Sequence, residues 1–291
     1  MTPHPNDIPV LPRGELRPLA GRGEVFVRVA GSEAAPPVLL LHGWQATADL
    51  NFFGVYEALA AQFRVIAPDL RGHGRSLYPE RRFTMEDAAD DCAALLGDLG
   101  VPSVVVVGYS LGGAVAQTIA DRHPDLIDGL VLAASDLAPA AHRRDKVANR
   151  VGGWLGTIQR MTSGRAAAHQ ILTRSTRECP AMERYRGWFV GELERGHAGS
   201  MRAAGVALLK FDGRPLAARK RDLPVATVIT RRDRLIPVAR QEGLAAAWRA
   251  TIVDLDADHD APIAQPAPLA AALIKAIGAV SGLLGERAVV A

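Results

Sequence analysis

Short apolar runs alternate along most of the chain with stretches in which apolar residues recur every three or four positions. The runs are rich in β-branched residues and mostly apolar throughout, which is typical of strands buried on both faces of a parallel sheet. The longer periodic stretches predict amphipathic helices. The predicted strands are 15–19, 24–30, 38–41, 64–67, 104–107, 129–133, 224–230 and 251–254. The predicted helices are 50–62, 86–99, 237–249 and 266–279, with a further one that ends near residue 122.

This order of elements predicts an α/β fold: a mostly parallel, eight-stranded sheet with helices on both faces. The first two strands are expected to form a hairpin turned by Gly21 to Gly23. A chain of 291 residues is long enough for one large domain of this kind with an inserted subdomain.

The alternation breaks between residues 137 and 215, where helical stretches follow one another without a convincing strand. We expect this segment to be a helical cap inserted after the sixth strand, with residues 1–136 and 216–291 forming the core. The segment has 14 Lys and Arg against 6 Asp and Glu, whereas the rest of the chain has 20 against 25. This excess is typical of solvated helix faces, and the alternative is a positive lid that attracts anionic substrates or lipid head groups.

Composition argues against several classes of protein. The net charge of +3 and the pI of about 9.1 are too mild to indicate a nucleic-acid partner. Neither a signal peptide nor a run of about 18 uncharged apolar residues occurs, so we expect a cytoplasmic protein without a membrane span. The distant Cys92 and Cys179 predict free thiols. No metal-type spacing of His and Cys occurs, so we expect neither a metal nor a cofactor.

The most informative stretch for function is 104–118. Four valines predict a buried strand, Gly108-Tyr109-Ser110-Leu111-Gly112 predicts a sharp turn, and a helix rich in small residues follows. This is the G-x-S-x-G nucleophile elbow in its strand–turn–helix context. The two glycines make room for a strained backbone that holds the serine Oγ above the sheet, where the helix dipole favours negative charge.

A serine hydroxyl needs a base to accept its proton and a third group to orient that base. Asp233 follows the seventh predicted strand and His259 follows the eighth. Because the carboxyl ends of parallel strands share one edge of the sheet, both side chains are expected near Ser110. Asp136 also ends a strand and is the alternative orienting acid.

Taken together, these pieces resemble the α/β-hydrolase superfamily, in particular its single-domain members with a helical cap. The resemblance extends from about residue 15 to residue 280. An elbow alone is a weak signal, but here five pieces stand in the family's order. They are His42-Gly43-Trp44, Pro68-Asp69-Leu70-Arg71-Gly72-His73-Gly74-Arg75-Ser76, the elbow at 108–112, Asp233 and His259.

The resemblance implies a role for each matching position. Ser110 would attack the substrate carbonyl, His259 would act first as base and then as acid, and Asp233 would fix the tautomer of the imidazole. Asp69 and His73 would be structural. The remaining implied positions are the oxyanion donors, which are the backbone N–H groups of Trp44 and Leu111, the elbow glycines Gly108 and Gly112, and the supporting residues His42 and Gly43.

A serine at the elbow argues against haloalkane dehalogenase and epoxide hydrolase relatives, which use aspartate there. The loop after His42 also lacks the glycine-rich segment of HGGG-type esterases and the His-Gly-x-Gly-Pro sequence of carbon–carbon hydrolases. We therefore expect hydrolysis of a small-molecule carboxylic ester with an apolar acyl group, bound between sheet and cap.

Several questions stay open at this level. The same three residues would also serve a thioesterase, lactonase, amidase or perhydrolase, and a silent ligand-binding homologue is a further alternative. The oligomeric state is not indicated. The apolar cap residues could equally line the pocket or pack inside the cap: Trp154, Leu155, Ile158, Met161, Trp188 and Phe189.

Overall fold

An eight-stranded sheet forms the centre of the protein, for which a computed structural model describes residues 7–76, 83–139, 173–219 and 222–281. The strand order is β1-β2-β4-β3-β5-β6-β7-β8. β1 and β2 pair antiparallel, β2 pairs antiparallel with β4, and all other neighbours are parallel, which confirms the predicted sheet. The strands are β1 (Gly14–Leu19), β2 (Gly23–Ala30), β3 (Pro37–Leu41), β4 (Arg64–Pro68), β5 (Val104–Tyr109), β6 (Ile127–Ala133), β7 (Val225–Thr230) and β8 (Thr251–Leu255).

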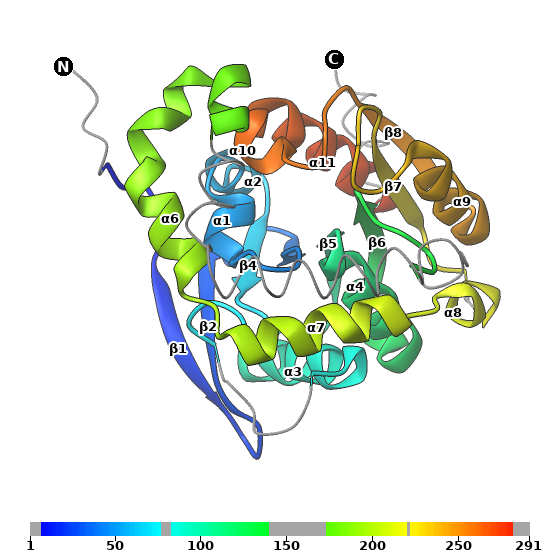
Figure 1. The fold of residues 1–291 in the computed structure, drawn as a ribbon. Coiled ribbons are helices and arrows are strands. Elements are labelled where there is room, and N and C mark those ends of the chain that lie inside the picture. The colour runs from blue at the N-terminus through cyan, green and yellow to red at the C-terminus, as the bar shows by residue number, and fades with distance from the viewer. Residues whose placement is uncertain (1–6, 77–82, 140–172, 220–221, 282–291) are drawn as a thin grey trace.

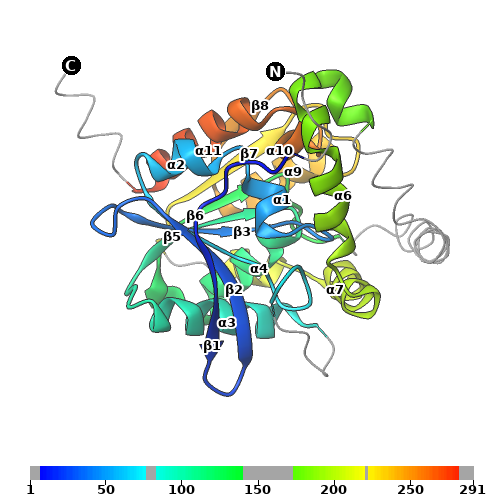
Figure 2. The same cartoon turned by 90° about the vertical axis from the view of Figure 1, so that its left-hand side faces the viewer.

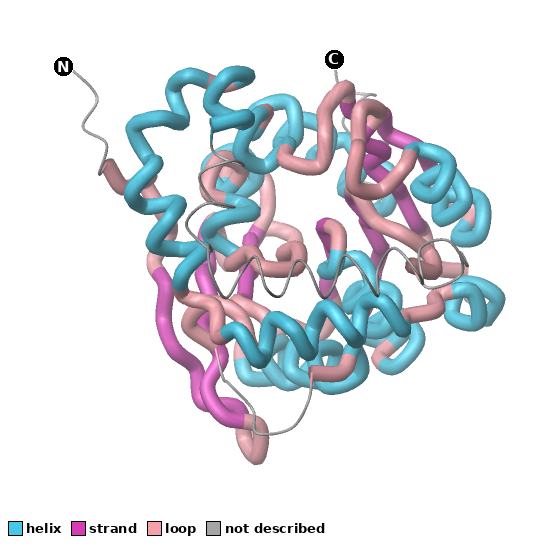
Figure 3. The backbone as a smooth tube through the Cα atoms, in the orientation of Figure 1, coloured by secondary structure: helices cyan, strands magenta, loops and turns pink. Residues whose placement is uncertain are grey.

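Helices cover both faces of this sheet (Figures 1 and 3). Val104 and Val106 of β5 pack into one apolar cluster with α3 and α4, while Val105 and Val107 pack into a second with α11. Figure 2 shows the sheet between α11 and α2 on one side and α3 on the other. The helices are α1 (Ala48–Phe52), α2 (Tyr56–Ala60), α3 (Met85–Asp98), α4 (Leu111–Arg122), α6 (Arg186–Glu194), α7 (Ala198–Lys210), α8 (Arg214–Arg219), α9 (Val238–Trp248), α10 (Ala261–Ala264) and α11 (Pro266–Ser281).

The single helix expected over 50–62 is two short helices, α1 and α2, separated by a turn at 53–55. Glycine weakens a helix interior, and Gly54 lies within this turn. A Cβ at that position would collide with Pro266 at the start of α11. The break therefore lets the chain pass close to α11.

The segment between β6 and β7, where we expect the cap, is helical over its described part. It contains α6, α7 and α8, whereas residues 140–172 lie outside the described residues, and with them Trp154, Leu155, Ile158 and Met161. Phe189 of α6 is fully buried and packs with Leu50 and Phe53. Its ring stands 5.3 Å from that of Phe53, centroid to centroid, with Trp188 beside both. These two aromatic residues thus pack α6 onto α1.

Many arginines of the described part of this segment are paired with acids. Only the pair with Asp258 offsets part of the excess positive charge, because the other three acids belong to the segment itself, and such pairs agree with the interpretation as solvated helix faces. The pairs are Arg174 with Asp258, Arg186 with Glu183, Arg195 with Glu192, and Arg214 with Asp212.

Candidate active site

Ser110 lies at the corner between β5 and α4. Its φ is 54° and its ψ is −116°, a conformation that costs a non-glycine residue about 1–3 kcal/mol. The Ser110 N–H donates to the Ala133 carbonyl at 2.9 Å, which ties the corner to β6. A Cβ on Gly108 would collide with the backbone of Gly112, and a Cβ on Gly112 would collide with the Leu41 carbonyl. The two glycines are therefore required by the close approach of β5, α4 and β3.

The structure brings the three predicted side chains together. His259 Nε2 lies 3.1 Å from Ser110 Oγ, and His259 Nδ1 lies 2.9 Å from Asp233 Oδ2. A carboxylate only accepts hydrogen bonds, so Nδ1 carries the imidazole proton and Nε2 presents its lone pair to the serine hydroxyl. This is the hydrogen-bond order in which an imidazole can take the proton of Ser110.

Asp233 is held by its own loop. Its Oδ1 accepts the N–H groups of Leu235 and Ile236, each at 2.8 Å, and its Oδ2 accepts the Thr230 hydroxyl at 2.7 Å. Burial alone would raise the pKa of this carboxyl, but the hydrogen bonds, led by that from His259, outweigh burial and hold the pKa below its ordinary value. The carboxylate is therefore ionised where it faces the imidazole.

The other acids near the site have different partners. Asp136, the alternative orienting acid, forms an ion pair with Arg240. Asp258 Oδ1 accepts the backbone N–H of His259 at 2.7 Å and that of Arg234 at 3.0 Å, so it joins the loop of the acid to the loop of the histidine. The Tyr109 hydroxyl holds the second loop from the other side by donating to the His259 carbonyl at 2.9 Å. Neither Asp258 nor Tyr109 was assigned this role from the sequence.

The two proposed oxyanion donors come from the start of α4 and from the loop after β3. Leu111 is the first residue of α4, so its N–H has no acceptor within the helix. The Gly43 carbonyl accepts His42 Nδ1–H at 2.8 Å. In a trans peptide the following N–H points the opposite way, so the Trp44 N–H is directed away from His42.

His42 is fixed as a neutral imidazole in this arrangement. The Leu70 N–H donates to its Nε2 at 2.9 Å, which leaves the proton on Nδ1 for the Gly43 carbonyl. Burial, reinforced by the nearby His73, lowers the pKa of His42 to about 3. His42 thus supports the loop and is not placed to exchange protons with Ser110.

Helices α6 and α7 contact the loop that follows β3. The Trp44 indole N–H donates to the Met201 carbonyl of α7 at 2.7 Å. The Thr47 hydroxyl donates to the buried Glu192 carboxylate of α6 at 3.1 Å, and Arg75 pairs with that carboxylate as well. No sequence motif pointed to Thr47 or Glu192, because their contact joins residues that are far apart in the chain.

Comparison with known proteins gives the family of the chain. A sequence profile described as the alpha/beta hydrolase fold matches residues 36–266. The chain belongs to the α/β-hydrolase superfamily. Its fold is that of hydrolases, as the resemblance in the sequence predicted.

The relatives of this α/β-hydrolase match different fractions of its length. The AB hydrolase superfamily protein YisY of Bacillus subtilis is 30% identical over 206 residues, which cover 69% of this chain and 75% of YisY. An uncharacterized protein of Mycobacterium tuberculosis is 40% identical over 121 residues, 42% of this chain. The match spans only 34% of that protein, so this chain covers about a third of the length of the first curated relatives.

A thermophilic esterase from Thermogutta terrifontis has a similar solved structure. The two chains are 26% identical with a TM-score of 0.74, and the superposition covers 92% of this chain and 99% of the esterase. The likeness therefore extends over most of this chain and almost all of the esterase.

The loop after β4 contains two buried titratable side chains, Asp69 and His73. Asp69 accepts the N–H groups of Ala48 and Arg75 at 2.8 and 2.9 Å, and burial raises its pKa to about 7. His73 Nδ1–H donates to the Arg71 carbonyl at 3.0 Å, and burial lowers the pKa of His73 to about 4. Both groups are buried, as expected for structural residues.

We expect the His73→Gln variant to lose less stability in acid than the wild type does. Folding lowers the pKa of His73 from 6.5 to about 4. As the pH falls below 6.5, His73 is therefore protonated in the unfolded chain while it is still neutral in the folded protein. Stability contributed by the neutral ring is therefore present above pH 6.5 and is lost as the pH falls toward 4. Between pH 7 and pH 5 the variant should lose about 2 kcal/mol less than the wild type. Urea unfolding at the two pH values measures this, and equal losses would mean that folded His73 is protonated.

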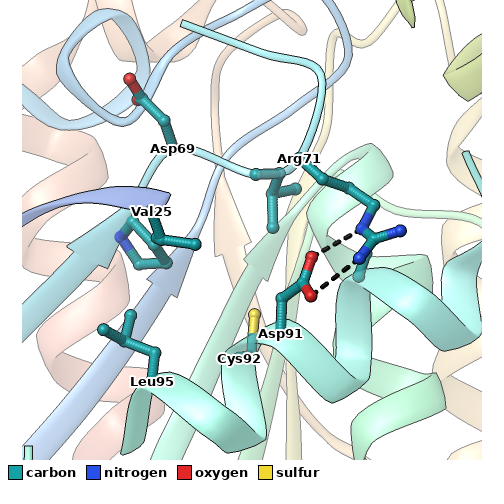
Figure 4. A pocket seen from close by; sticks show the side chains of 9 residues that line it. Val25, Asp69, Arg71, Asp91, Cys92 and Leu95 are labelled. Carbon is teal, nitrogen blue, oxygen red and sulfur yellow. Dashed lines mark hydrogen bonds and ion pairs between the residues drawn. The ribbon is translucent and has the colours of Figure 1, made fainter. Parts of the chain in front are cut away.

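A small pocket lies between α3 and the loop after β4 (Figure 4). Arg71 and Asp91 close one wall through two hydrogen bonds of 2.6 and 2.8 Å. Burial, reinforced by Asp91, raises the pKa of the Cys92 thiol in this pocket, so the thiol is unreactive. None of the lining residues belongs to the group formed by Ser110, Asp233 and His259.

Among the described residues, no group of three or more His, Cys, Asp or Glu side chains could hold a metal ion. No helix in the same part of the chain is both long and apolar enough to cross a membrane.

Proposed function

We propose that this α/β-hydrolase cleaves carboxylic esters of small molecules through an acyl-serine intermediate. The observation that carries the proposal is the hydrogen-bonded series from Asp233 Oδ2 through His259 to Ser110 Oγ, with distances of 2.9 and 3.1 Å. Its order matches the sequence of proton transfers that ester hydrolysis requires.

In the first step Ser110 Oγ attacks the ester carbonyl while His259 Nε2 takes the hydroxyl proton. The resulting imidazolium is stabilised by the ionised Asp233 carboxylate, which stays unprotonated. The carbonyl oxygen becomes an oxyanion that the N–H groups of Trp44 and Leu111 would hold. His259 then returns the proton to the leaving alcohol, and the acyl group remains on Ser110.

In the second step water attacks the acyl-serine, with His259 again acting as base. The oxyanion forms a second time at the same carbonyl carbon, so the same two N–H donors serve both steps. Collapse of this intermediate releases the acid and restores the Ser110 hydroxyl. No group beyond water and the ester is needed to balance the reaction.

We place the substrate between the sheet and a cap formed by residues 137–215. Helices α6 and α7 of that segment contact the loop of Trp44 and Thr47, so they border the same edge of the sheet as Ser110. The esterase from Thermogutta terrifontis supports an ester as the substrate, because the two chains are 26% identical and superpose over 92% of this chain. An apolar acyl group is proposed because the cap sequence is rich in apolar residues.

The wild-type protein is expected to hydrolyse p-nitrophenyl acetate, butyrate or octanoate, and a fluorophosphonate probe should label Ser110. Mass spectrometry of the labelled protein identifies the modified residue. A panel that adds an acyl thioester, a lactone and an amide of the same acyl group then separates ester cleavage from the other reactions of such a site. A protein that turns over none of these compounds and takes no label would instead be a binding protein with this fold.

A further inference from the structure

Gly43 lies close to the side chains of both Asn51 and the nucleophile Ser110. The Gly43 N–H donates to Asn51 Oδ1 at 2.8 Å. A Cβ on residue 43 would lie 3.3 Å from that oxygen and 3.4 Å from Ser110 Cβ. Asn51 and Ser110 therefore face the same side of Gly43, although Asn51 belongs to α1 and Ser110 to the corner after β5.

The two peptide groups that flank Gly43 are each held by a side chain. Asn51 Oδ1 holds the N–H of one, and His42 Nδ1–H holds the carbonyl of the other at 2.8 Å. Glycine has the widest choice of backbone angles, so the direction of the Trp44 N–H would vary without these contacts. With both contacts, the conformation of Gly43 and the direction of the following N–H are fixed.

Of the two polar atoms of the Asn51 carboxamide, only the oxygen forms a hydrogen bond within the described part of the chain. Its oxygen must face the Gly43 N–H, because the NH₂ end cannot accept a hydrogen bond. Asn51 Nδ2 is buried and has no hydrogen-bond partner among the described residues. A buried donor without a partner costs about 1–3 kcal/mol, so stability alone does not explain an asparagine here.

The helix that carries Asn51 is itself well anchored. The Thr47 hydroxyl accepts the Leu50 N–H at 3.1 Å and so caps α1. Asp69 Oδ1 accepts the Ala48 N–H at 2.8 Å at the same end of α1. Asn51 thus reaches back from a fixed helix to the loop that precedes it.

We propose that Asn51 is a positioning residue for ester hydrolysis: its Oδ1 fixes Gly43 and thereby aims the Trp44 N–H at the oxyanion. This inference rests on the proposed function, since it names the support of one of its two oxyanion donors. Asn51 acts through the loop and not through contact with the reacting atoms. Its loss should therefore raise the barrier of the chemical steps and leave ground-state binding nearly unchanged.

The test compares Asn51→Ala and Asn51→Leu with Ser76→Ala. Leucine keeps the branched shape of Asn51 but has no group that can accept the Gly43 N–H, and unlike alanine it leaves no cavity. Ser76 is the matched control, because its buried Oγ also accepts a backbone N–H, that of Phe26, at 2.9 Å, but in the sheet. Loss of one oxyanion donor costs on the order of 10²–10³ in turnover, and a misaligned donor should cost about 10- to 100-fold.

Both Asn51 variants should show this loss in kcat with KM changed less than about threefold, and Ser110 should react with the fluorophosphonate more slowly by a similar factor. The pH profile of kcat/KM should keep its shape, because His259 and Asp233 are untouched. Ser76→Ala should lose thermal stability with kcat within about twofold of the wild type. Rates, melting temperatures and labelling kinetics are all measured on the full chain.

Three outcomes would overturn the inference. Asn51 variants with wild-type kcat and labelling rate would remove Asn51 from the reaction. A KM effect without a kcat effect would place it in substrate binding. If neither variant folds while Ser76→Ala does, Asn51 is structural. A wild-type protein without ester turnover or label would overturn the proposed function itself, which separates the two failures.

Discussion

Replacing Ser110 with alanine is expected to lower ester hydrolysis by a factor on the order of 10⁴ to 10⁶. The variant lacks the oxygen that forms the acyl-serine, and neither His259 nor Asp233 can replace it. The proposed oxyanion donors are unchanged in this variant and would account for any residual rate above that of water. Initial rates of p-nitrophenyl ester hydrolysis measure this loss of activity. The fluorophosphonate should no longer label the variant.

Ser110→Gly is the informative companion to this variant. Both changes remove the hydroxyl, but only glycine adopts a φ of 54° without strain. Relief of the strain should exceed the extra chain entropy of glycine, so Ser110→Gly should be more stable than Ser110→Ala by about 1 kcal/mol. Urea unfolding compares the two. Equal stability would show that the corner is not strained, while turnover in either variant would remove Ser110 from the nucleophile's role.

The sheet was predictable because its strands are short, apolar and separated by clear turn signals. β5 illustrates this, since the valines at 104–107 fill both core clusters and leave no polar position to obscure the pattern. The elbow was predictable for a similar reason: Gly108 and Gly112 mark positions where the backbone of β3, β5 and α4 leaves no room for a side chain. Such steric requirements show directly in the sequence as glycines, even where they join distant segments, as at Gly112 and Leu41.

The choice between two candidate acids was not settled by the sequence. Asp136 and Asp233 both follow a strand of the sheet, and strand ends alone do not fix the direction of a side chain. The structure separates them through loop contacts: Asp233 is held by the N–H groups of Leu235 and Ile236, whereas Asp136 pairs with Arg240. Backbone donors leave no trace in residue identity, so this distinction needs coordinates.

The sequence also did not predict the contacts that support the loop after β3, which carries the proposed oxyanion donor Trp44. The contact between Asn51 and Gly43 joins a helix to the turn before it, and that between Glu192 and Thr47 joins residues 145 positions apart. No rule of sequence spacing predicts either of these contacts. Between β6 and β7, apolar residues at helical spacing did not distinguish a pocket wall from a packing interface, and Phe189 belongs to the interface with α1.

Asp233→Asn is the second change for which we expect a large effect, a loss on the order of 10⁴ in kcat. The geometry of the site dictates how the carboxamide would sit. The position of Oδ1 receives the N–H groups of Leu235 and Ile236, so the amide oxygen must occupy it. The NH₂ group is then forced into the position of Oδ2, which faces His259 Nδ1 and the Thr230 hydroxyl.

An NH₂ group at this place makes Nδ1 an acceptor and moves the imidazole proton to Nε2, where it faces Ser110 Oγ. The ring then has no lone pair for the serine proton, although all distances stay nearly the same. KM should change little, the fluorophosphonate should react slowly, and circular dichroism should match the wild type. Asp136→Asn is the matched control, because it removes the charge of the rival acid and should keep kcat within about threefold. A larger loss in Asp136→Asn than in Asp233→Asn would reverse the assignment of the orienting acid.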